Sequence, residues 1–147
     1  MIVFVGNNFS PNILTKWIEQ INLNSNDFIY LNINDDALQS TLKKAYAIIA
    51  LGNIASKVLN KINVPHFTLP HHHKNKLQLI DCRHYIIKQY YKPGTIIHFN
   101  DFKWGCFLIL DVWDKNMIGS INFNGTGYRS QVFRCDKLHN RYSILEG

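Results

Sequence analysis

Four short polar segments of this chain hold side chains that suit nucleotide chemistry. Asn8 and Asn32 each follow a short apolar run, Gly52-Asn53 opens a helical pattern, and 71–76 is a loop of histidine, lysine and asparagine. Side-chain amides and imidazoles can both donate and accept hydrogen bonds. Lysines and the free amides at a helix start bind phosphate. These residue types predict a nucleotide-handling site.

Strands and helices must alternate regularly to bring these segments together. We expect strands at Ile2–Val5, Asp27–Ile33, Ala45–Leu51 and Val64–Leu69. Helices are expected after the Ser10-Pro11 start signal, over Ala37–Lys44 behind an Asp35-Asp36 cap, from Gly52-Asn53, and over Lys76–Tyr91 with Leu77, Ile80, His84 and Ile87 on one face. This pattern predicts an α/β fold, a minimal three-layer unit with a four-stranded parallel sheet. In such sheets ligands bind outside the carboxyl ends of the strands, where the polar segments lie.

The pattern changes after Lys92-Pro93-Gly94. The runs that follow are strand-like, are separated by turn residues and carry no helical stripe. We therefore expect two domains, an α/β domain over 1–91 and a small SH3-like antiparallel β domain over 92–147. The aromatic residues of the second domain, Trp104 and Trp113 among them, are expected mainly in its core, with base stacking as the alternative. Its exposed 125–129 turn is a candidate contact for DNA, a protein partner or the first domain.

The charge of the chain is concentrated in one segment. The net charge is +6, and residues 41–92 hold nine lysines and arginines against Asp81 alone. This distribution favours an anionic partner, DNA first, and the alternative is a solvated surface without a ligand.

Composition and sequence patterns limit the class of protein. With 147 residues, 46% of them hydrophobic, the chain can bury a core without a cofactor. The absence of a long apolar run and of a leader at Met1–Val5 predicts a soluble protein of the cytoplasm, the host cytoplasm if the source is viral. Three cysteines without a C-x-x-C pair are expected as core thiols in a reducing compartment. The abundance of Asn, Ile and Lys suggests an AT-rich genome such as that of a phage.

The order of the motifs resembles the uracil-DNA glycosylase superfamily. The resemblance rests on Phe4–Asn8, Tyr30–Asn32, Leu51–Lys57 and Leu69–His71, and it covers roughly residues 1–90 as a shortened form. It implies a DNA-binding protein that flips a uracil or related pyrimidine out of the DNA and hydrolyses its N-glycosidic bond. By the resemblance, Asn8 positions water, Asn32 reads the base edge and His71 stabilises the departing base.

The resemblance also indicates which residues would surround the base and which would contact the DNA. Gly6, Asn7 and Phe9 would line the base pocket, with Phe9 as the stacking aromatic. DNA contacts would come from Gly52, Asn53, Ser56, Lys57, His72, His73, Lys74 and Lys76, with Leu77 as a wedge in the duplex. The resemblance implies neither a metal nor a redox cofactor.

Two departures from the family pattern keep other functions open. Phe9-Ser10 stands where the family has a Pro and a small or aromatic residue, and His72-His73 replaces Pro-Ser. One alternative is a catalytically inactive relative that binds DNA, a nucleotide or a replication, repair or defence partner. Another is an interaction protein without a nucleic-acid role, its partner held through the C-terminal β domain.

The histidines could instead form a metal site. His66, His71, His72, His73 and His84 carry imidazoles that suit zinc, nickel or copper. Adjacent histidines point in different directions, however, and no Cys, Asp or Glu stands at a ligand spacing. We therefore expect no metal.

Overall fold

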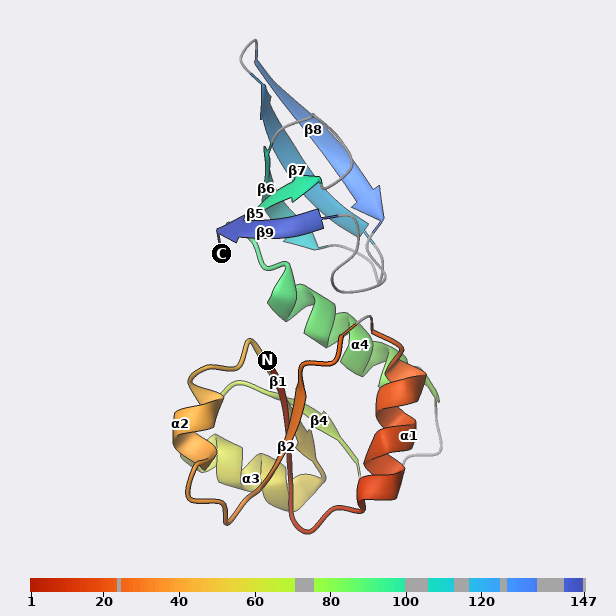
Figure 1. Ribbon diagram of the computed structural model, residues 1–147, viewed down its shortest axis with the longest axis vertical. Coiled ribbons are helices and arrows are strands. Elements are labelled where there is room, and N and C mark those ends of the chain that lie inside the picture. The colour runs from red at the N-terminus through yellow and green to blue at the C-terminus, as the bar shows by residue number, and fades with distance from the viewer. Residues whose placement is uncertain are drawn as a thin grey trace. The chain divides into compact units, whose positions relative to one another are not determined.

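The computed structural model describes residues 1–23, 25–70, 76–99, 106–112, 117–124, 127–134 and 142–146. Within them the chain forms two compact units, Met1–Ile86 and Ile87–Gly147 (Figure 1). No helix in these ranges is long and apolar enough to cross a membrane.

The first unit is an α/β unit, which confirms the expected fold class. Its elements are β1 (Ile2–Gly6), α1 (Pro11–Ile21), β2 (Phe28–Asn32), α2 (Leu38–Leu42), β3 (Ala47–Leu51), α3 (Asn53–Lys61), β4 (Phe67–Leu69) and the greater part of α4 (Lys76–Tyr90). The strands form a parallel sheet in the order β2-β1-β3-β4. β1 and β3 are buried along their whole length because they are the central strands.

Helices cover both faces of this sheet (Figure 1). Alternate residues of a strand point to opposite faces, so Val3, Val5, Ile48 and Ala50 share one face. They form an apolar cluster with Leu38 and Leu42 of α2 and with Ala55 and Leu59 of α3. Phe67 lies on the other face, where its ring is 5.6 Å from that of Tyr85 in α4.

The buried side of α4 differs from the predicted one. Leu77 and Ile80 are 56% and 38% exposed, whereas Leu79, Cys82 and Ile86 are buried and Ile87 is buried as expected. The apolar residues of this helix lie nearly all round it, so their spacing did not single out one face. Burial raises the pKa of the Cys82 thiol, and it also raises the pKa of Tyr85, with a smaller contribution from Cys82.

Two of the predicted helix starts also differ in detail. Pro11 occupies the first turn of α1 as expected, but the Ser10 side chain makes no capping hydrogen bond. The residue at the N-cap of α2 is Ala37, and Asp35 Oδ1 accepts its backbone N–H at 2.9 Å. Asp35 therefore stabilises the turn before α2 without capping the helix itself.

The second unit is an antiparallel sheet. Its strands β5 (Ile96–Phe99), β6 (Cys106–Val112), β7 (Met117–Asn124), β8 (Gly127–Arg134) and β9 (Tyr142–Glu146) pair in the order β8-β7-β6-β5-β9. The sequence pattern had not predicted β9. Gly94 turns the chain with a positive φ of 90°, and its N–H donates to the carbonyl oxygen of Ile109 at 2.9 Å. Tyr91, Ile97, Phe107 and Ile109 are buried.

Candidate functional site at the carboxyl edge of the sheet

The parallel sheet brings the polar segments of the α/β unit to one edge, as predicted. Gly6 at the end of β1 pairs with Asn32 at the end of β2 and with Leu51 at the end of β3. Leu51 in turn pairs with Leu69 at the end of β4. The loops that follow the four strands therefore leave the sheet on the same side.

Two side-chain amides meet at this edge. Asn32 Nδ2 donates to Asn8 Oδ1 at 2.7 Å, which joins the β1–α1 loop to the end of β2. Asn8 is exposed and has a left-handed backbone with φ of 53°, a conformation that asparagine tolerates better than most residues. Asn32 Oδ1 also accepts the Asn34 N–H in a long contact of 3.4 Å. The structure thus brings together the two asparagines that the sequence assigned to water and to the base.

The hydrogen bonds of this asparagine pair leave several donors for a ligand. The pair uses one hydrogen of Asn32 and one lone pair of Asn8. Neither hydrogen of the Asn8 amide, nor the second hydrogen of Asn32, has a hydrogen-bond partner in the described part of the chain. Three N–H donors suit carbonyl oxygens, of which a pyrimidine such as uracil has two.

Gly6 and Phe9 belong to the packing beneath the asparagine pair. A Cβ on Gly6 would lie 3.0 Å from Phe9 Cβ and 3.0 Å from the Tyr30 ring and hydroxyl, so only glycine fits without movement of its neighbours. The Phe9 ring is 9% exposed and lies 5.0 Å from the ring of Trp17. This burial favours a structural role for Phe9 over stacking on a base. Asn7, between them, is half-buried.

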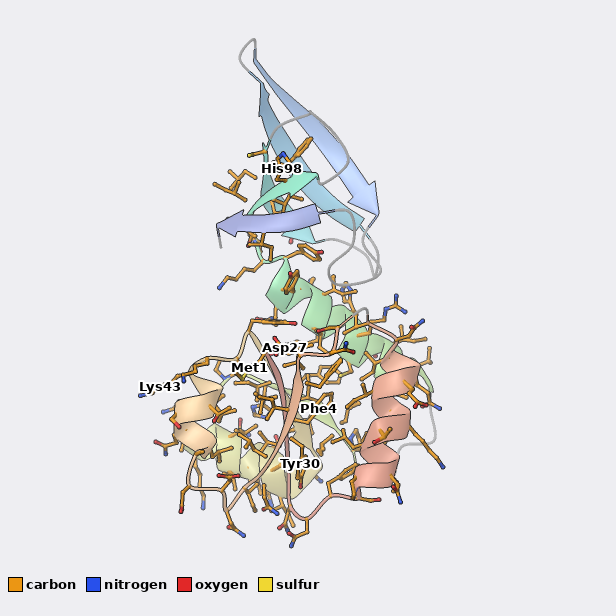
Figure 2. The ribbon with its side chains drawn as sticks, in the orientation of Figure 1. Met1, Phe4, Asp27, Tyr30, Lys43 and His98 are labelled. Atoms are coloured by element: carbon orange, nitrogen blue, oxygen red, sulfur yellow. The ribbon has the colours of Figure 1, made fainter. Side chains whose placement is uncertain are left out.

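Tyr30 is a residue of the site that sequence reasoning missed. Tyr30 lies on β2 (Figure 2). Its hydroxyl accepts the backbone N–H of Phe9, the residue after Asn8, at 3.0 Å. Tyr30 and Asn32 are two residues apart on β2 and so point to the same face. That period-two spacing was the signal in the sequence. Tyr30 holds the loop in the conformation that presents Asn8 to Asn32.

The start of α3 forms the second part of the edge. Gly52 is the N-cap residue, with φ of 93°, and its N–H donates to the carbonyl oxygen of Leu69 at 2.7 Å. Asn53 is exposed in the first turn, where backbone N–H groups have no partner within the helix. The helix start and the end of β4 are therefore joined by a backbone hydrogen bond.

Ser56 is engaged in a chain of hydrogen bonds between α3 and the start of β4. Its Oγ lies 2.8 Å from His66 Nε2 and accepts the Thr68 hydroxyl at 3.1 Å. His66 Nδ1 lies 2.8 Å from the carbonyl oxygen of Val64, which can only accept, so Nδ1 carries the hydrogen. Sequence reasoning had placed Ser56 on DNA and had not connected it to His66 and Thr68, whose i, i+2 spacing was the available signal.

The remaining predicted residues are either exposed or outside the described part of the chain. His71, His72, His73 and Lys74 are outside the described residues, as is the side chain of Lys76. Lys57 is exposed on α3, and Leu77 is exposed in the first turn of α4, as a wedge would have to be. In the part of the chain that the structure describes, no three His, Cys, Asp or Glu side chains form a group able to hold a metal ion.

Comparison with known proteins adds nothing to this geometry. No protein-family model, no curated protein and no solved structure matches the chain.

Proposed function

We propose that the α/β unit binds DNA at the carboxyl edge of its sheet and hydrolyses the N-glycosidic bond of a flipped uracil or related pyrimidine, as its sequence resemblance to uracil-DNA glycosylases implies. The observation that carries the proposal is the Asn8–Asn32 hydrogen bond of 2.7 Å at the ends of β1 and β2. The two residues are 24 positions apart in the sequence. In the sheet order, the end of β1 stands between the end of β2 and the end of β3, after which Gly52 opens α3.

The proposed chemistry divides between water and the leaving base. Water adds to C1′ of the sugar while the C1′–N bond breaks and the bonding electrons leave with the base, whose oxygen becomes more negative. Free amide hydrogens of Asn8 and Asn32 can donate to base carbonyls, and His71 is the proposed donor to the developing oxyanion. The proton lost by water passes to solvent, since Asn8 has no basic group. Slow turnover follows from that absence.

A second candidate function is a catalytically inactive relative that binds DNA or a nucleotide, or holds a replication, repair or defence partner. It is favoured by the same amide pair. Asn8 Oδ1 already accepts a hydrogen bond from Asn32, which leaves one lone pair to orient a water. Asp35, the nearest carboxylate along the chain, has Oδ1 bonded to the Ala37 N–H.

We propose that the second unit is an SH3-like β domain that supplies a contact for a protein partner or for DNA. Its strand order, with the last strand beside the first of a four-stranded meander, supports this proposal.

The deciding experiment incubates the purified protein with labelled single- and double-stranded oligonucleotides that contain one uracil, followed by alkaline cleavage. Strand breaks at the uracil, reduced at least tenfold in Asn32→Ala and His71→Ala, are expected. Asn34→Ala is the matched control, because the exposed Asn34 takes part in the edge only through its backbone N–H. Retarded DNA without cleavage selects the inactive relative. Neither cleavage nor retardation rejects both functions.

A further inference from the structure

Four exposed lysines lie on α3 and in the turn that follows α2. Lys43 and Lys44 follow α2, and Lys57 and Lys61 lie one turn apart on α3. Asp35 and Asp36 are exposed in the turn before α2, and residues 37–80 contain no further Asp or Glu. We call Lys43, Lys44, Lys57 and Lys61 the lysine face.

The lysine face lies on one side of the sheet of the α/β unit. α2 and α3 pack against the same apolar cluster through Leu42 and Leu59, so the lysines that flank these two residues lie on one layer. Figure 2 shows Lys43 projecting outward from the α2 side of the unit. The exposed polar side chains within α2 and α3 are neutral, namely Gln39, Ser40, Asn53 and Asn60, and the large apolar Ile54 is exposed as well.

The opposite layer has a different charge pattern. On α1 the exposed Lys16 is accompanied by Glu19, and on α4 Asp81 accompanies the basic residues. The two lysines of α3, in contrast, have no carboxylate on their own helix. Electrostatic attraction to a polyanion depends on such clustering, not on the total charge alone.

We infer that the lysine face binds the phosphate backbone of the DNA whose base enters the carboxyl edge. α3 starts at that edge and runs back along the sheet for nine residues, about 13 Å at the usual helical rise, so its lysines extend the contact away from the base. The face would hold phosphates at positions distant from the flipped nucleotide and would give affinity without sequence preference. This inference rests on the proposed function for the identity of the polymer, and it assigns Lys43, Lys44 and Lys61 a role that motif reasoning did not.

The test measures the affinity of the full-length protein for an undamaged 20-base-pair duplex at several salt concentrations. Each lysine that neutralises a phosphate contributes about 0.9 to the slope of log affinity against log salt on duplex DNA. The variant Lys57→Gln/Lys61→Gln should lower that slope by about 1.8, which makes the loss of affinity between 50 and 200 mM salt about 12-fold smaller. Adding Lys43→Gln and Lys44→Gln should double the reduction in slope.

The matched control is Lys16→Gln/Lys88→Gln, which removes the same charge from exposed positions on α1 and α4. An equal reduction of slope in this control would show a general charge effect and overturn the inference. So would an unchanged slope in the lysine-face variants, or binding of the wild type to phosphatidylserine vesicles but not to DNA.

Failure of the lysine face and failure of the proposed function are distinguishable. Asn32→Ala should keep its affinity for undamaged duplex while losing cleavage at uracil, whereas the lysine-face variants should lose affinity for both duplexes. Salt-dependent binding through the lysine face without any cleavage would support this inference and reject the glycosylase.

Discussion

The left-handed backbone conformation of Asn8 sets the position of its side chain in the proposed site. Its φ of 53° is costly for most side chains, by about 1–2 kcal/mol. Asn8→Ala should therefore unfold at lower urea concentration than Asn8→Gly, with a difference in unfolding free energy of about 1 kcal/mol. Both variants lose the bond to Asn32, so the comparison isolates the backbone. Equal stabilities would contradict the left-handed conformation.

The buried thiol of Cys82 makes stability depend on pH in the alkaline range. Burial raises the pKa of this thiol above its ordinary value of 9.0, so in the unfolded chain it ionises first. The unfolded state then holds fewer protons than the folded state, and the free energy of unfolding falls as pH rises above 9, by about 1.4 kcal/mol per pH unit. Below pH 9 the contribution is fully present.

This pH dependence is checked by urea unfolding between pH 8 and pH 10.5 for the wild type and Cys82→Ala. The variant should be less stable at pH 8 because it loses buried volume, and its decline with pH should be shallower. Parallel curves would show that Cys82 ionises equally well in the folded protein.

At the scale of elements, close packing joins β1, β2 and the loop into α1. Gly6→Ala introduces a Cβ 3.0 Å from Phe9 and Tyr30, and it should destabilise the protein by about 1–3 kcal/mol. Tyr30→Phe keeps the ring but removes the acceptor for the Phe9 N–H, at a cost of about 1–3 kcal/mol. Thermal unfolding measures both. A neutral Gly6→Ala would mean that Tyr30 moves aside without cost.

The hydrogen bonds among Ser56, His66 and Thr68 attach α3 to the edge strand β4. A double-mutant cycle of Ser56→Ala and Thr68→Val should give a coupling energy of about 0.5–1.5 kcal/mol, because the two hydroxyls bond directly. Urea midpoints of the four proteins supply the cycle. Coupling near zero would mean that the two hydroxyls act independently.

At the scale of the whole molecule, α4 contributes to both compact units. Ile87 is buried and belongs to the second unit, although it lies on a helix that starts in the first. Tyr91, which directly follows that helix, is also buried and belongs to the second unit. A fragment cut after Tyr91 should therefore expose apolar surface and bind more of the dye ANS than the full chain. The fragment with Ile87→Gln should bind less dye than the unmodified fragment. Equal dye binding by fragment and full chain would show that these residues are buried without the second unit.

The sequence by itself determined the class of the first unit and the position of its edge. Strand-like apolar runs alternate with helical patterns along the first unit, and the strands end at Gly6, Asn32, Leu51 and Leu69. This local alternation is sufficient to predict a parallel sheet with its polar loops on one side. The sequence therefore predicted Asn8 and Asn32 at the same edge, but it did not predict the hydrogen bond between them.

Tertiary structure decided the rest. Contacts between segments far apart in the chain decided which face of α4 is buried and added the strand β9 to the second sheet. Such contacts also placed the Tyr30 hydroxyl against the Phe9 N–H and put the four lysines on one side of the first sheet. Apolar spacing on α4 fits more than one face, and charge along a chain does not say which helices share a layer. Those choices are made when the sheet and its helices pack, because burial of side chains depends on neighbours that local sequence does not specify.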